Sequence, residues 1–221
     1  KRNDEVQLTE IDIVVEGMSA VDFGRNLHKL HPESNFHYFR EFKTSTLKLP
    51  EIILDFATAR KEYYSSGGAL PAVKDSDLYS DLQRRDFTIN SIGVSLNGED
   101  FGSVHDYFGG QRDIKERLLR VLHQKSFFDD PTRVLRLIRF KNTHDLEIEE
   151  NTEKIMKFSL DYGITESIKG IRLTRELKYI FNSLDPIPGI RDLEKYGLLK
   201  KIFGWQSADY DQLEKLNTSV N

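Results

Sequence analysis

The sequence predicts an α+β fold, with short strands and helices mixed in the first half and a mainly helical pattern after about residue 115. The β-branched run 11–15 is typical of a strand. Residues 44–49 and 52–57 predict two further strands, joined by a turn at Pro50. The apolar spacing over 19–30 predicts a helix after the first strand.

The later elements are predicted with less regular patterns. Residues 67–77 are expected to form a loop, because the segment begins with a Gly-Gly pair. Residues 87–96 fit a helix and a strand equally well. Asp130-Pro131 predicts a helix start with proline at the first helical position. Further helices are expected over 149–158, 173–180 and 190–196.

Bulk composition excludes several classes of protein. No apolar run approaches 18 residues, so we expect no membrane span, and the start KRNDEVQLTE is unlike a signal peptide. The absence of cysteine excludes disulfides and thiolate zinc sites, and it fits a cytoplasmic location. The net charge of −4 argues against a generally basic surface, yet residues 112–141 hold nine Lys or Arg and four acids. Such a local basic surface suits phosphate-bearing ligands, and equally an ordinary solvated helix face.

The segment RRDFTIN, residues 84–90, places two guanidinium groups, a carboxylate, a hydroxyl and an amide within seven residues. The guanidinium of Arg85 is a planar fork suited to phosphate or to base edges. The carboxylate of Asp86 can accept from ribose hydroxyls or orient a neighbouring arginine. The simpler interpretation is a surface network of Arg and Asp side chains at the end of a strand.

Two acids flank Ile11 at the start of the first predicted strand. Because side chains alternate along a strand, Glu10 and Asp12 share one face. Carboxylates placed in this way can both reach a hard divalent cation. Asp55 lies inside an apolar run, where an acid is costly unless it is paired or metal-bound, and it is the candidate third acid. Solvated acids without a metal are the alternative.

The segment DDPTRVLRLIRF, residues 129–140, separates into two faces when it is plotted as a helix. One side is core, and the other carries Arg133, Arg136 and Arg139 on successive turns. Stacked cations repel unless an anion lies along them, which could be a triphosphate, an RNA backbone or partner carboxylates. Asp130 is expected either to cap the helix or to bind a ligand, and capping leaves one of its oxygens free.

These motifs in this order resemble those of the class II tRNA nucleotidyltransferases and bacterial poly(A) polymerases. The resemblance runs through EIDIVVEG at 10–17, DFATAR at 55–60, RRDFTIN at 84–90, DYFGG at 106–110 and DDPTRVLRLIRF at 129–140. It continues more weakly through LEIEENTEKI at 146–155 and RLTREL at 172–177. It implies a polymerase-β-like nucleotidyltransferase head with a mixed sheet over 1–118, a helical neck over 119–183 and the start of a helical body over 184–221.

The resemblance also implies a role for each candidate residue. Glu10 and Asp12 match the family's metal-binding acids, and Asp55 matches its third catalytic acid. The residues that match the nucleotide site are Arg85, Asp86, Asn90, Asp130, Arg133, Arg136 and Arg139. Within this set, Asp130 and Arg133 match the pair that reads the Watson–Crick edge of ATP or CTP.

The implied activity is a Mg²⁺-dependent addition of CMP or AMP, from CTP or ATP, to the 3′ end of tRNA. Whether CCA, CC or A is added stays open. One alternative is a poly(A) polymerase acting on RNA 3′ ends. The other is a truncated or degenerate module that binds tRNA or nucleotide without turnover. The RNA contact is expected in the helical module after residue 145, where Lys154, Lys157, Lys169, Arg172 and Arg175 are available.

Several positions depart from the family pattern. The glycine-rich GGxVRD element, which precedes the metal strand in the family, is absent, because Glu10 follows only nine residues. We expect either that this element lies outside the sequence or that the triphosphate is bound in another way. Residue 10 is Glu where Asp is usual, and Lys43 stands where a small residue is common. The chain also ends short of the body and tail that grip tRNA in the family.

Overall fold

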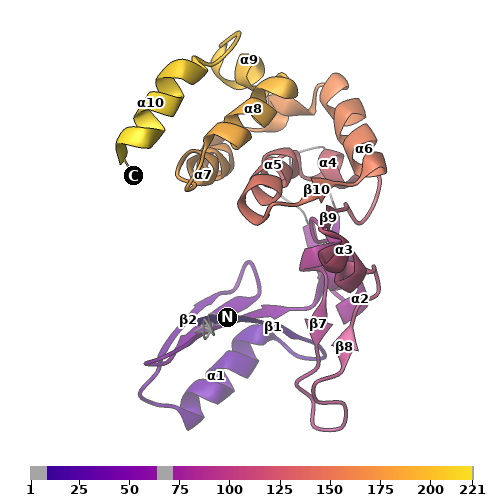
Figure 1. Cartoon of the computed structure of the whole chain (residues 1–221). Coiled ribbons are helices and arrows are strands. Elements are labelled where there is room, and N and C mark those ends of the chain that lie inside the picture. Colours follow the sequence, from indigo (N-terminus) through magenta and orange to yellow (C-terminus); the bar gives the residue numbers. More distant parts are fainter. Residues whose placement is uncertain (1–8, 64–71, 221) are drawn as a thin grey trace. The chain divides into compact units, whose positions relative to one another are not determined.

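The computed structural model describes residues 9–63 and 72–220, which fall into two compact units (Figure 1). Among the described residues, the first unit comprises 9–63 and 73–84, and the second comprises residue 72 and 85–220. The units therefore divide between Arg84 and Arg85, inside RRDFTIN. The domain boundaries expected after residues 118 and 183 remain predictions.

A four-stranded mixed sheet forms the first unit, in the order β1-β4-β3-β2. Strands β1 (Glu10–Val15) and β4 (Ile53–Thr58) run parallel. Strand β3 (Thr44–Lys48) is antiparallel to both β4 and β2 (Asn35–Phe39). The α+β prediction is confirmed, and so are the predicted strands at 11–15, 44–49 and 52–57.

Helix α1 (Ala20–Leu30) covers one face of this sheet. Ser19 caps the helix by accepting from the backbone N–H of Val21. The core beneath it contains Val15, Leu47 and Phe56. Since side chains alternate along each strand, the opposite face carries the acids of β1 and β4. One apolar helix face thus fixes which side of the sheet stays polar.

A two-stranded ribbon, apart from residue 72, and a short helix complete the first unit. Strand β5 (Arg60–Tyr63) pairs with β6 (Ala72–Asp75), and α2 (Leu78–Gln83) follows with Asp77 as its N-cap. The prediction of a loop over 67–77 is therefore wrong for 72–75, because a pairing partner made β6 a strand. The Gly-Gly pair on which that prediction rested lies outside the described residues.

The second unit begins with short elements. The segment 87–96, predicted as helix or strand, forms a 3₁₀ turn, η1 (Thr88–Asn90), and then β7 (Gly93–Val94), which pairs with β8 (Val104–His105). Helix α3 (Gly110–Glu116) packs against η1. Strand β9 (Leu118–Leu119) pairs with β10 (Glu147–Ile148).

The rest of the second unit is helical. Its helices are α4 (Ser126–Asp129), α5 (Arg133–His144), α6 (Glu150–Asp161), η2 (Ile164–Ser167), α7 (Gly170–Phe181), α8 (Ile187–Lys195), α9 (Leu198–Phe203) and α10 (Tyr210–Val220). They enclose a core that includes Phe87, Leu135, Ile138 and Met156. No helix among the described residues is long and apolar enough to cross a membrane.

The helix start predicted at Pro131 is wrong by two residues. Helix α4 ends at Asp129 and α5 begins at Arg133, so Pro131 lies in the turn between them. The carboxylate of Asp130 accepts from the backbone N–H of Thr132. Asp130 therefore organises the entry to α5, as expected of a capping acid, from two residues upstream of the N-cap position, which Thr132 occupies.

The contact between α3 and η1 predicts the effect of Gly110→Ala. A Cβ at Gly110 would lie 2.3 Å from the backbone oxygen of Thr88 and 2.8 Å from Cγ1 of Ile92. Because backbone must shift to relieve this overlap, we expect a loss of about 1–3 kcal/mol in the free energy of unfolding, measured by urea denaturation. Gly98→Ala is the control, since nothing lies within 4 Å of that Cβ. Equal stability of the two variants would contradict the close approach.

Candidate functional site

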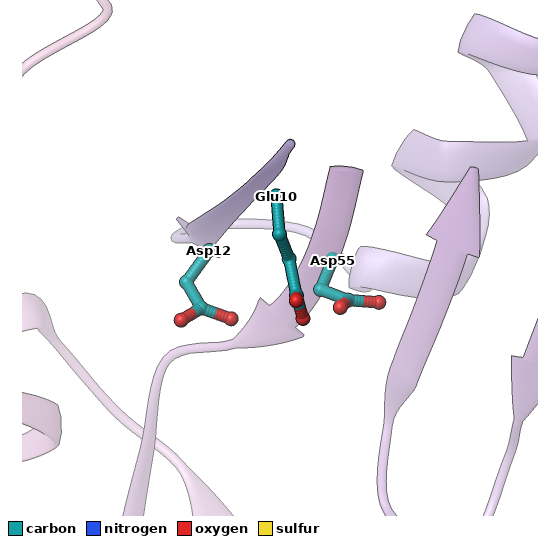
Figure 2. Close-up of side chains that lie close together, drawn as sticks. All are labelled: Glu10, Asp12 and Asp55. Atoms are coloured by element: carbon teal, nitrogen blue, oxygen red, sulfur yellow. The ribbon is translucent and has the colours of Figure 1, made fainter. Parts of the chain in front are cut away.

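Three acids of the first unit lie together on the polar face of the sheet. Ligand atoms of Glu10, Asp12 and Asp55 all lie within 4.8 Å of one another, and Figure 2 shows the three side chains side by side. Asp12 and Asp55 are direct partners in the register of β1 and β4. The hydroxyl of Thr46, on β3, donates to Oδ1 of Asp55. The predicted alternation thus brings the three sequence-separated acids into one cluster.

The charges of this cluster suit a cation. Hydrogen bonding to Asp55 is the largest cause that raises the pKa of Glu10 above its ordinary value, followed by the charge of Asp55, burial and the charge of Asp12. A raised pKa means that the three carboxylates repel one another when all are ionised. A divalent cation with oxygen ligands would relieve this repulsion, so the donor set fits such an ion.

The segment RRDFTIN is divided between two structural tasks. Arg84 belongs to the first unit, where it pairs with Glu62 at 3.0 Å and with Asp81 at 2.7 Å. Arg85 belongs to the second unit, and its Nη1 donates to the backbone oxygen of Asn90 at 3.2 Å. Arg84 thus forms the expected network with acidic side chains, but the network lies at the end of helix α2 with both acids buried, rather than on the surface at the end of a strand.

Asp86 is buried, and both of its carboxylate oxygens accept hydrogen bonds. Its Oδ1 accepts from the backbone N–H of Phe87 and from Nδ2 of Asn90, at 2.8 and 3.0 Å. Its Oδ2 accepts from Nε and Nη2 of Arg136, at 2.8 and 2.5 Å. Burial alone would raise the pKa of Asp86, but the Arg136 charge and the hydrogen bonds lower it below 3.8. Asp86 thus stabilises the fold at neutral pH, and this contribution is lost as the pH falls from 3.8 through the lowered native pKa.

The arginines of α5 find partners on a distant helix. Arg136 pairs with Glu176 of α7 at 3.5 Å, in addition to Asp86. Nε of Arg139 donates to Glu176 at 2.8 Å. Of the three kinds of anion expected beside these arginines, carboxylates of the protein are the ones that Arg136 and Arg139 contact.

Arg133 does not join that column. It is 5% exposed, and its Nη1 donates to Oγ of Ser126 at 2.7 Å. The prediction that Arg133 shares a polar face with Arg136 and Arg139 is wrong, because α4 supplies polar partners on what the helical wheel shows as the outer side. The predicted core side is confirmed, with Val134, Leu135, Leu137 and Ile138 all at 0% exposure.

Asp130 is held by the turn and by α7. Its Oδ1 accepts from the N–H and the hydroxyl of Thr132, at 3.0 and 2.6 Å, and pairs with Nη2 of Arg172. Arg172 also donates to the hydroxyl of Thr132 at 3.1 Å. The sequence predicts Arg172 as a cation available to RNA, whereas the structure pairs it with Asp130, one of the predicted nucleotide-site residues.

Several residues of these clusters were not predicted from the sequence. Thr46 and Glu176 contribute to the acid cluster and to the arginine network respectively. Asp113 is wholly buried and accepts from Thr88 and Arg120, at 2.7 and 3.0 Å. For Glu176, the sequence signal is the segment RLTREL, in which Arg172 and Glu176 stand one helical turn apart.

The predicted site residues thus form two groups, one in each compact unit. The first unit holds the acids Glu10, Asp12 and Asp55. The second unit holds Arg85, Asp86, Asn90, Asp130, Arg133, Arg136 and Arg139. The first group can bind a divalent metal ion, and the second offers guanidiniums and a partly exposed carboxylate to a polar ligand.

Comparison with known proteins gives matches over most of the chain. Residues 3–120 match the family described as Poly A polymerase head domain, and residues 145–208 match the probable RNA and SrmB-binding site of polymerase A. An A-adding tRNA nucleotidyltransferase of Aquifex aeolicus is 38% identical over 218 residues, which are 97% of this chain and 26% of the relative. The chain therefore spans about a quarter of that relative.

Solved structures show the same fold. The apo form II of a CCA-adding enzyme is 42% identical, with a TM-score of 0.83 over 88% of this chain and 46% of the other. A tRNA nucleotidyltransferase complexed with a primer tRNA and an incoming ATP analog is 35% identical, with a TM-score of 0.82 over 95% and 58% of the two chains. The mixed sheet and the helices described above thus match the head and neck of these enzymes, which confirms the predicted fold class.

The acid cluster predicts how Asp55→Asn will respond to metal. At about 100 times its dissociation constant, Mg²⁺ or Mn²⁺ should stabilise the wild-type chain by about 2.7 kcal/mol, seen as a raised midpoint of thermal unfolding. Asp55→Asn should lose most of this gain, because it removes a ligand charge, while its stability in EDTA stays equal or rises. Asp22→Asn, an exposed acid on α1, should respond as wild type does. Equal metal stabilisation in all three would contradict the assignment of the cluster as a metal site.

Proposed function

Because the chain belongs to the family of class II tRNA nucleotidyltransferases and bacterial poly(A) polymerases, we propose that it transfers a nucleotide to the 3′ end of tRNA. The terminal hydroxyl of the tRNA attacks the α-phosphate of ATP or CTP. The bond between the α- and β-phosphates breaks, the hydroxyl loses its proton, and pyrophosphate leaves. The observation that carries the proposal is the cluster of Glu10, Asp12 and Asp55 on the paired strands β1 and β4.

The three acids are assigned to the metal. Glu10 and Asp12 provide the ligands at the start of β1, and Asp55 is the third acid, oriented by the hydroxyl of Thr46. We assign Mg²⁺, whose preference for carboxylate oxygens matches the donor set. When bound, the ion lowers the pKa of the attacking hydroxyl and offsets the charge that develops on the leaving group.

The nucleotide is assigned to the residues of the second unit. Asp130 is assigned to the base as the acceptor for its amine. Arg133, although only 5% exposed, is assigned from the family resemblance as the donor to the ring nitrogen or carbonyl. Arg85, Asn90 and Asp86 hold the sugar and phosphates, with Asp86 acting through its pairing with Arg136. Arg139 supports the site through Glu176.

The nucleotide added is assigned from the relatives. Three relatives, which align with 97%, 87% and 96% of this chain, are named A-adding tRNA nucleotidyltransferases. Their names favour AMP as the added nucleotide. A poly(A) polymerase shares the same motifs and differs in product length, so extension by a single residue separates the two.

A cytoplasmic location belongs to the same proposal, in keeping with the absence of cysteine.

Asp12→Ala tests the proposed reaction. Removing this ligand should lower incorporation of labelled ATP into tRNA lacking its terminal A by about a thousandfold or more, while ATP binding stays near wild type. The measurement is product formation on a sequencing gel, together with equilibrium binding of ATP. Asp22→Ala removes an exposed acid of the same unit and should keep wild-type activity.

The outcomes separate the competing functions. Full activity of Asp12→Ala would contradict the assigned metal site. Long adenylate tails made by the wild-type protein would favour a poly(A) polymerase. Binding of ATP and tRNA by the wild-type protein, without incorporation of ATP or CTP, would favour a module without turnover.

A further inference from the structure

The two carboxylate oxygens of Asp130 lie in different environments. Oδ1 takes all the polar contacts: the N–H of Thr132, the hydroxyl of Thr132 and the guanidinium of Arg172. Within residues 9–63 and 72–220, no hydrogen bond is donated to Oδ2. The Asp130 side chain is 21% exposed. One oxygen is therefore anchored, and the other is available to accept from a ligand.

Arg172 is the part of this anchor that comes from another element. It lies in the first turn of α7, and α7 packs against α5. Its Nη2 contacts both members of the turn, Oδ1 of Asp130 and the hydroxyl of Thr132 at 3.1 Å. Glu176, one turn further along α7, holds Arg136 and Arg139 in the same way. Helix α7 is thus fixed at two points against the segment that carries Asp130.

We propose that Arg172 is a positioning residue that sets base specificity by anchoring Oδ1 of Asp130, so that Oδ2 faces the exocyclic amine of adenine or cytosine. This inference rests on the proposed function. In this role Arg172 does not touch the nucleotide but acts through the direction in which the Asp130 carboxylate points.

The chemistry of the bases gives the anchored oxygen its selectivity. Adenine and cytosine present an exocyclic amine donor at the position where guanine and uracil present a carbonyl acceptor. An ionised carboxylate only accepts, so it binds the amine and repels the carbonyl. A carboxylate free to rotate can turn away from a carbonyl, and the penalty against guanine then falls. Loss of the anchor should therefore weaken ATP binding and narrow the preference for ATP over GTP.

Equilibrium binding of ATP, CTP and GTP to the full chain tests the inference without requiring turnover. Arg172→Met should weaken ATP and CTP binding by about tenfold and reduce the preference for ATP over GTP by about tenfold. Arg172→Lys keeps a cation and should restore most of that preference. Lys178→Met removes an exposed cation of the same helix and should leave the binding of all three nucleotides unchanged.

Steady-state incorporation gives a second measurement. The anchor acts on base binding, so Arg172→Met should raise KM for ATP more than it lowers kcat. A purely structural role would lower the midpoint of thermal unfolding without changing the ratio of ATP to GTP affinity. If Arg172→Met does not fold, Thr132→Val removes the hydroxyl contact to Oδ1 and should shift the same ratio, by a smaller factor.

Two results would overturn the inference, and they are distinguishable. A folded Arg172→Met with the wild-type ratio of ATP to GTP affinity overturns the role of Arg172 and leaves the proposed function intact. A wild-type chain that binds neither ATP nor CTP removes the proposed function and this inference together.

Discussion

The ion pair between the buried carboxylate of Asp86 and the partly exposed guanidinium of Arg136 is the interaction on which the arrangement of residues 85–90 and 130–139 depends. Burying a carboxylate is costly, and the cost is offset only when each oxygen is hydrogen-bonded and the charge is paired. Asp86 meets both conditions through Phe87, Asn90 and Arg136. The pair joins segments 50 residues apart, so η1 and α5 are held together by charge as well as by the apolar core.

Helix α7 extends this logic to the other side of α5. It offers a cation to Asp130 and an acid to Arg136 and Arg139, so each of these three side chains meets the opposite charge. The hydrogen bonds to Asp130 all reach Oδ1, which leaves Oδ2 to accept from a ligand. Asp86 differs, because both of its oxygens accept hydrogen bonds within the protein. In the first unit the opposite holds: Glu10, Asp12 and Asp55 gather like charges, which fits a cation as the missing partner.

The sequence predicts those features that depend on one element alone. Alternation along a strand placed Glu10 and Asp12 on one face, and helical periodicity identified the core side of α5. It could not predict the partners of Arg136 and Arg139, because Glu176 lies 37 residues or more away and a helical wheel contains no neighbours. The burial of Arg133 could not be predicted for the same reason, since Ser126 of α4 accepts from its Nη1. Residues 72–75 became a strand through pairing with β5, which composition does not show.

A double-mutant cycle on Asp86 and Arg136 is the most direct test that this pair organises residues 85–90 and 130–139. The free energy of unfolding would be measured by urea denaturation for the wild type, Asp86→Asn, Arg136→Met and the double variant. We predict a coupling of about 2 kcal/mol, because removing Arg136 leaves the charge of Asp86 buried without its cation. Additive effects, with a coupling below about 0.5 kcal/mol, would contradict the claim.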